Sequence, residues 1–175
     1  MATTCKLIAK NVLGSNAADV TFSDIPQSGY TDLVLLISAR SNRATVTYDS
    51  VSLLLNADTA NNMTGRTLRG SGSAASSFSQ AAAKALEIDT SATGADATSN
   101  SFGSLEVYIP NYAGSTNKSI SATAVHETNA STAYIGAVAG LWSNTAAITS
   151  IKITPSGANN FVTNSSFFLY GITKA

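Results

Sequence analysis

The chain contains one histidine and one cysteine, so the side chains that most often carry chemistry in proteins are scarce. His126 is followed directly by Glu127, but the second histidine of a zinc-protease motif is missing. A lone histidine acts as a general base only where a serine and an acid converge on it. Because serine is abundant throughout this chain, a serine near His126 in sequence carries little information. We therefore interpret His126 as a polar residue on a strand face.

The remaining candidates for chemistry are isolated. The ten acidic residues are dispersed, and only Glu87 and Asp89 lie close together on one side of an expected strand. Two carboxylates from distant strands can cleave a glycosidic bond, but aromatic platforms for sugars are few, at 7% of the residues. The loop 56–62 offers Asp58 and several asparagines as calcium ligands, with a single acid. The fragment at 70–72 lacks the lysine of a phosphate-binding loop. We predict no enzyme activity, no metal and no cofactor.

Composition and charge exclude further classes of protein. Ten basic residues balance ten acidic ones, so no long-range field gathers phosphate groups and nucleic-acid binding is disfavoured. One cysteine excludes an internal disulfide, and we expect Cys5 to be a small, buried apolar residue of a strand. The longest apolar runs are far shorter than the ~20 residues of a membrane-spanning helix. We expect a soluble protein with no membrane partner.

The elements that position these residues read as strands. Apolar and polar residues alternate in many segments, for example across 104–109, which is the period of half-buried antiparallel strands. Two runs, 33–37 and 51–55, are apolar or nearly so on both faces and predict strands covered on both sides. Turn-forming residues separate the segments. The expected strands are 5–13, 18–23, 31–40, 46–55, 85–89, 102–109, 117–127, 133–142, 148–154 and 166–173.

These strands predict one all-β domain over residues 1–175, an antiparallel jelly roll or β-sandwich. Residues 56–101 differ, because alanine, serine, threonine, asparagine and glycine dominate them. We interpret them as a long insertion made mostly of loops. Within it, residues 74–86 could form a short helix, since alanine is the best helix former and Phe78, Ala82 and Leu86 would share a face.

Three segments carry a resemblance to a known group of proteins. They are FSDIPQSGYTDLVLLISARS (22–41), a long segment over 103–153 that contains YIPNYAG and AGLWSNTAAITSI, and NFVTNSSFFLYGI (160–172). They resemble small virion structural proteins of tailed bacteriophages, similar to those of cyanophages. The likeness covers most of the chain and weakens over 56–101. It implies a jelly-roll cement or decoration protein, homotrimeric, that binds the major capsid protein on the outer surface of the capsid after synthesis in the host cytoplasm. It brings no catalytic residues with it.

The residue pattern agrees with a binding role and leaves an alternative open. Zero net charge with few charged groups removes the repulsion that keeps subunits apart. Aromatic residues at loops are favoured interface anchors, so Tyr108, Tyr112 and Trp142 are the expected partner contacts, although Tyr108 and Trp142 could equally cap the core. The alternative function is a tail, baseplate or fibre component that binds a host surface glycan. A small glycan-active tail enzyme is a third and weaker hypothesis.

Overall fold

The computed structural model describes residues 4–129 and 132–173. Secondary structure in these residues consists of strands, and no helix in them is long and apolar enough to cross a membrane. The strands are β1 (Cys5–Val12), β2 (Val20–Phe22), β3 (Tyr30–Ala39), β4 (Tyr48–Leu55), β5 (Met63–Gly70), β6 (Ala75–Ala83), β7 (Leu86–Thr93), β8 (Gly103–Ile109), β9 (Lys118–His126), β10 (Tyr134–Trp142), β11 (Ile151–Pro155) and β12 (Ser166–Thr173).

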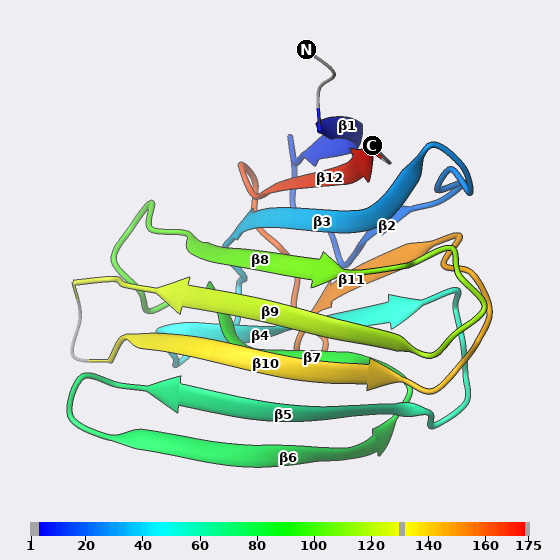
Figure 1. The fold of residues 1–175 in the computed structure, drawn as a ribbon. Coiled ribbons are helices and arrows are strands. Elements are labelled where there is room, and N and C mark those ends of the chain that lie inside the picture. Colours follow the sequence, from blue (N-terminus) through cyan, green and yellow to red (C-terminus); the bar gives the residue numbers. More distant parts are fainter. Residues whose placement is uncertain (1–3, 130–131, 174–175) are drawn as a thin grey trace.

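The strands form two sheets packed face to face. One sheet has eight strands in the order β1-β12-β3-β8-β9-β10-β5-β6, and the other has four in the order β2-β11-β4-β7. Every paired neighbour is antiparallel. Figure 1 shows the larger sheet as a broad layer, with β4 and β7 behind its centre. The predicted all-β antiparallel sandwich is therefore confirmed, whereas the jelly-roll connectivity stays a prediction.

The core lies between the two sheets and follows from the period-two patterns. In β8, Leu105, Val107 and Ile109 are buried, and the residues between them are exposed. Isoleucine and leucine side chains of β4 and β11 meet this face from the smaller sheet. Strand side chains alternate between faces, so a segment that buries every second residue contributes half of its side chains to the core. The expected strand segments all match strands of the structure to within a few residues.

The interpretation of residues 56–101 as a loop insertion with one helix is wrong. The segment contains β5, β6 and β7, and the residues expected to form the helix lie in β6 and at the start of β7. β5 pairs with β10 along its whole length, and β6 extends the same sheet. The helix propensity of alanine is a weak preference, and pairing with an existing sheet edge outweighs it here.

The expectation that 33–37 and 51–55 are covered on both faces is also wrong. In β3, Leu33, Leu35 and Ile37 are buried in the core, but Leu36 on the opposite face is 38% exposed. Leu54 in β4 is likewise only partly buried. Both sheets therefore present one uncovered face, and on the larger sheet that face carries apolar side chains.

Cys5 is exposed, which corrects the expectation that it is buried. It lies at the start of β1, the edge strand whose residues are exposed or half-buried on both faces. The cause is the difference in sheet width, because four strands cannot cover both ends of an eight-stranded layer. β6 at the opposite edge is uncovered in the same way.

Candidate functional site

Of the three aromatic residues expected at an interface, only Tyr108 lies at the surface. Tyr108 is 37% exposed on the outward face of β8, and its hydroxyl donates a 2.9 Å hydrogen bond to a carboxylate oxygen of Asp32. The other oxygen of Asp32 accepts from the backbone N–H of Asn111 at 2.8 Å. The hydrogen bond to Asp32 is the main cause that raises the pKa of Tyr108. Asp32 therefore fixes this ring against the start of the following turn.

Tyr112 and Trp142 are buried, so the prediction that they are exposed anchors is wrong. Tyr112 is 0% exposed, and its hydroxyl donates to the backbone carbonyl of Pro26. Burial raises the pKa of this hydroxyl. Trp142 is 1% exposed, and its indole Nε1–H donates to Asp58 Oδ2 at 2.9 Å. Both rings cap the core, a role that the sequence left open for Trp142 but not for Tyr112.

Asp58 organises the end of the sandwich where the sequence offered calcium ligands. Its Oδ2 accepts hydrogen bonds from Trp142, Asn62 and Asn144, and its Oδ1 accepts from the backbone N–H of Ala60. These donors, the Ala60 amide first, lower the pKa of Asp58 to about 2. Because N–H donors surround both oxygens, the carboxylate is occupied in tying two loops together, and a cation would have to displace these donors.

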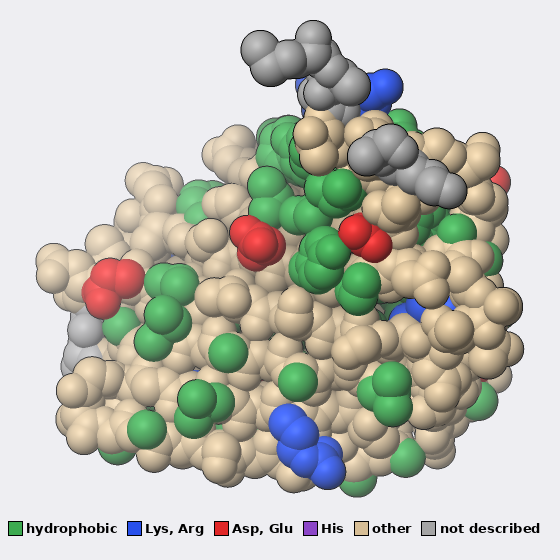
Figure 2. Space-filling model, viewed as in Figure 1, with side chains coloured by type: hydrophobic (Ala, Val, Ile, Leu, Met, Phe, Trp, Pro, Cys, Tyr) green, Lys and Arg blue, Asp and Glu red, His purple; other side chains and the backbone are tan. Residues whose placement is uncertain are grey.

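The most extensive candidate surface is the outer face of the eight-stranded sheet. Its outward side chains over β9, β10, β5 and β6 are mostly serine, threonine and alanine, whereas β12 and β3 contribute larger residues such as Phe168, Tyr170 and Leu36. The exposed large apolar residues on it include Leu36, Leu68, Tyr108, Val125, Ile135 and Leu141. Figure 2 shows this face as broad, with apolar side chains scattered among uncharged polar ones and few charged groups. A shallow apolar depression runs over β9, β10, β5 and β6, lined by Leu68, Ser77, Thr123, Ala137 and Ala139 among others.

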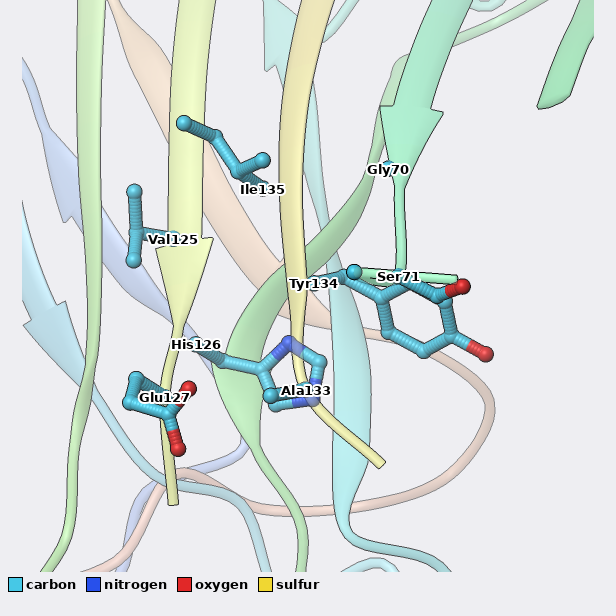
Figure 3. Close-up of a pocket in the computed structure, with 9 residues that line it drawn as sticks. Gly70, Ser71, Val125, His126, Glu127, Ala133, Tyr134 and Ile135 are labelled. Carbon is cyan, nitrogen blue, oxygen red and sulfur yellow. The ribbon is translucent and has the colours of Figure 1, made fainter. Parts of the chain in front are cut away.

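The second candidate is a small pocket at the end of β9 and β10, with a volume of about 210 Å³. His126 lies at its base and is 0% exposed. Figure 3 shows the His126 ring directed from β9 toward the segment that carries Ala133 and Tyr134, whereas the Glu127 carboxylate lies over β9. Burial lowers the pKa of His126, although Thr132, Glu127, Asp89 and Thr90 oppose the shift. Within residues 4–129 and 132–173, neither ring nitrogen makes a hydrogen bond.

Aromatic and charged side chains enclose His126. Its ring centroid lies 5.6 Å from that of Tyr48 and 5.3 Å from that of Tyr134. The guanidinium of Arg69 stands 4.8 Å from the centre of the Tyr134 ring and forms a 2.7 Å ion pair with Asp89. The neutral imidazole is thus packed as an aromatic ring among other rings, which favours the uncharged form.

This arrangement does not assemble acid–base machinery. Ser71 lines the pocket, but its hydroxyl bonds with Ser73 and with the backbone of Ala74. The Glu127 carboxylate accepts from the backbone N–H of Asn129. In the described part of the chain, therefore, no serine or acid hydrogen-bonds to the imidazole, as a nucleophile relay needs. No group of three or more histidine, cysteine and acidic side chains gathers there to hold a metal.

Lys118 is a buried cation that sequence reasoning missed. It is 0% exposed at the start of β9, and its ammonium donates to the backbone carbonyls of Gly114, at 2.7 Å, and of Thr116, at 2.5 Å. Burial lowers the pKa of Lys118. The alternation of 118–126 with small residues could have signalled its inward direction, since Lys118 shares a face with Ile120 and Ala122. Its contacts assign it to closing the turn 110–117.

Comparison with known proteins gives no family. No family model matches the chain, and no curated protein matches it. Among solved structures, a match is found to the crystal structure of scytalido-glutamic peptidase with a peptide based transition state analog, at 11% identity and a TM-score of 0.27. The match covers 91% of this chain and 66% of that chain, so this chain spans just under two thirds of that protein. A TM-score of this size carries no argument about fold or function.

Proposed function

We propose that this chain is a non-enzymatic structural protein of a tailed-bacteriophage virion, a cement or decoration subunit that binds the major capsid protein on the outside of the shell. The observation that carries the proposal is the outer face of the eight-stranded sheet: broad, nearly uncharged and dotted with exposed apolar side chains. The exposed apolar side chains around the shallow apolar depression over β9, β10, β5 and β6 favour a protein interaction site there. The resemblance of YIPNYAG, AGLWSNTAAITSI and the closing LYGI to phage virion proteins supplies the identity of the partner.

The outer face suits docking onto a repetitive shell. Serine, threonine and alanine side chains lose little conformational entropy when they are immobilised. Leu68 and Ile135 are each 58% exposed and lie on neighbouring strands, where they can act as apolar anchors. We further propose a homotrimer, because contacts made by three linked copies add through effective concentration even where each is weak.

The proposal is tested with phage particles that lack the protein. Purified protein is added back to expanded shells, and bound copies are counted by densitometry after sedimentation. We expect hundreds of copies per particle and a higher temperature of shell disruption. If particles without the protein are equally heat-stable and complete but fail to adsorb to cells, the cement role is wrong and the tail or fibre role replaces it. A copy number of a few dozen or fewer leads to the same conclusion.

A further inference from the structure

The outer edge of β6 differs from the three other sheet edges. β1 carries Lys6 and Lys10 and a register shift in its pairing with β12. In the smaller sheet, β2 has three residues and β7 pairs with a register shift between Asp49 and Val51. Charged residues, irregular pairing and short length are the means by which edge strands avoid pairing with other chains.

β6 has none of these protections along most of its length. Its nine residues, ASSFSQAAA, include no charged side chain and no proline, and nearly all of them are exposed. The shift in its pairing with β5 falls near its end, so residues 75–80 pair regularly. Within the described part of the chain, β6 pairs only with β5, which leaves its other edge available. A long, flat, uncharged edge strand is a template for adding another strand.

A second feature of β6 also indicates a partner. Phe78 lies opposite Thr67, on the inward side of the sheet, yet it is 42% exposed because the smaller sheet does not extend under β6. Its one aromatic contact in the described residues is with Arg69, whose guanidinium lies 5.5 Å from the ring centre. An apolar ring on an overhanging strand and an unpaired edge on the same strand are two separate signs of one interface.

We propose that β6 pairs with β6 of a second copy of this chain, antiparallel about a two-fold axis, so that two eight-stranded sheets become continuous. The charge pattern favours this occupant. The strand brings no like charges against its own copy, and Lys84, just after β6, lies at opposite ends of an antiparallel pair. The two-fold axis also places both Phe78 rings on the same side of the joined sheet. Each ring can then cover part of the β6 surface of the other copy that the smaller sheet leaves exposed.

This inference rests on the proposed function in one respect: on a shell, the two-fold contact would link neighbouring trimers. The contact itself uses the free edge of β6, whereas the proposed docking uses the outer face of the sheet. The inference therefore has its own test on purified protein without shells. Single cysteines replace residues 76, 77, 78, 79 and 80 in turn, in a Cys5→Ser background, and disulfide-linked dimers are measured after mild oxidation. An antiparallel two-fold pair brings only residues near its axis next to their own copies.

The expected result is a crosslinking yield that peaks at one position or two adjacent positions and falls on both sides. For a peak at residue 76, 78 or 80, the double variant Ser77→Lys/Ser79→Lys sets lysines against lysines and should reduce the peak yield at least tenfold. For a peak at residue 77 or 79, Ser76→Lys serves the same purpose. The matched control Ser119→Lys/Ser121→Lys, on the outer face of β9, should leave the peak yield unchanged. Equal thermal midpoints of the two double variants would show that both remain folded.

A flat or absent crosslinking profile overturns the proposal. So does a preference of the β6 cysteines for native Cys5 when it is restored, because Cys5 lies in β1 and such a link means head-to-tail pairing of β6 with β1. If the peak appears but the protein does not bind shells, the pairing holds and the proposed function fails. If the protein binds shells but the crosslinking peak is absent, the proposed function holds and the β6 pairing is wrong.

Discussion

At the scale of single residues, sequence reasoning placed the strands of the aromatic side chains correctly but not their exposure. Tyr108 and Trp142 occupy expected strands, yet one faces outward and the other is buried beside Asp58. Proximity to a turn does not decide between the two directions, because one residue's shift along a strand reverses the face. The partner of the indole, 84 positions away in sequence, could not be predicted without the fold.

We expect His126→Phe to remove an acid-sensitive part of the stability. Burial lowers the pKa of His126 below its ordinary 6.5, so only the unfolded chain takes up the proton just below that pH. The contribution of the neutral His126 ring to the free energy of unfolding is complete above pH 6.5. It is lost as the pH falls from 6.5 toward the lowered pKa of the folded protein. Thermal unfolding of wild type and variant at intervals between pH 7.5 and 4.5 measures this. Parallel curves would contradict the effect.

We expect Asp58→Ala to lower the free energy of unfolding by about 1–3 kcal/mol, since it leaves the buried indole N–H of Trp142 without its acceptor. In the wild type the contribution of Asp58 is present above pH 4 and lost as the pH falls through its pKa of about 2. Urea denaturation followed by the fluorescence of Trp142, the single tryptophan, measures both effects. Glu106→Ala, on the exposed face of β8, is the control and should change little.

At the scale of elements, period-two patterning predicted the strands in which large apolar residues alternate with polar ones. It failed to predict strands in which small residues take the place of the large apolar ones. β6 contains one large apolar side chain, Phe78, so its sequence has no alternation of large apolar and polar residues that could predict a strand. Hydrogen bonds between residues far apart in the sequence could not be predicted from it either. The Arg40 guanidinium, for instance, donates to the backbone carbonyls of Ala95, Ala97, Thr98 and Ser101, and so holds in place a segment that reads as a loose loop in the sequence.

The two glycines of β10 provide a matched pair of substitutions. A Cβ at Gly140 would lie 2.6 Å from a methyl carbon of Leu86 in β7, whereas at Gly136 the nearest atom is the Thr90 hydroxyl oxygen at 3.5 Å. We expect Gly140→Ala to destabilise the fold by roughly 1–3 kcal/mol through overpacking. Gly136→Ala should be neutral or stabilise it by up to about 1 kcal/mol, since glycine weakens a strand. Chemical denaturation of both variants measures the difference, and equal effects would contradict the close packing of β7 on β10.

At the scale of the whole molecule, neutrality of charge is the property that composition predicted most directly. Ten basic and ten acidic groups cancel, and the outer face carries few of either. The sheet arrangement that makes this face continuous was not predictable, because it depends on β5 and β6 extending the sheet beyond β10. Composition therefore described the character of the surface, and only the fold revealed its extent.

A consequence of this neutrality is that the proposed binding to shells should depend little on salt. We expect the dissociation constant to change less than threefold between 50 and 500 mM sodium chloride, because apolar and neutral polar contacts are not screened by ions. Sedimentation of shells with increasing protein at both salt concentrations measures it. The single variant Ala137→Asp, in the depression on the outer face, should weaken binding at either concentration without changing the thermal midpoint. Strong salt dependence of the unmodified protein would mean that another, charged surface makes the contact.

The position of β12 between β1 and β3 has a consequence for the order of folding. These neighbours are synthesised first, but their shared partner spans Ser166–Thr173, so both strands keep an unpaired edge until nearly the whole described chain has left the ribosome. Long-range strand pairing of this kind folds slowly and exposes edges meanwhile. During that interval we expect the lysines of β1 to limit its pairing with other chains, whereas the apolar run of β3, Leu33–Ile37, stays open on one edge until β12 arrives.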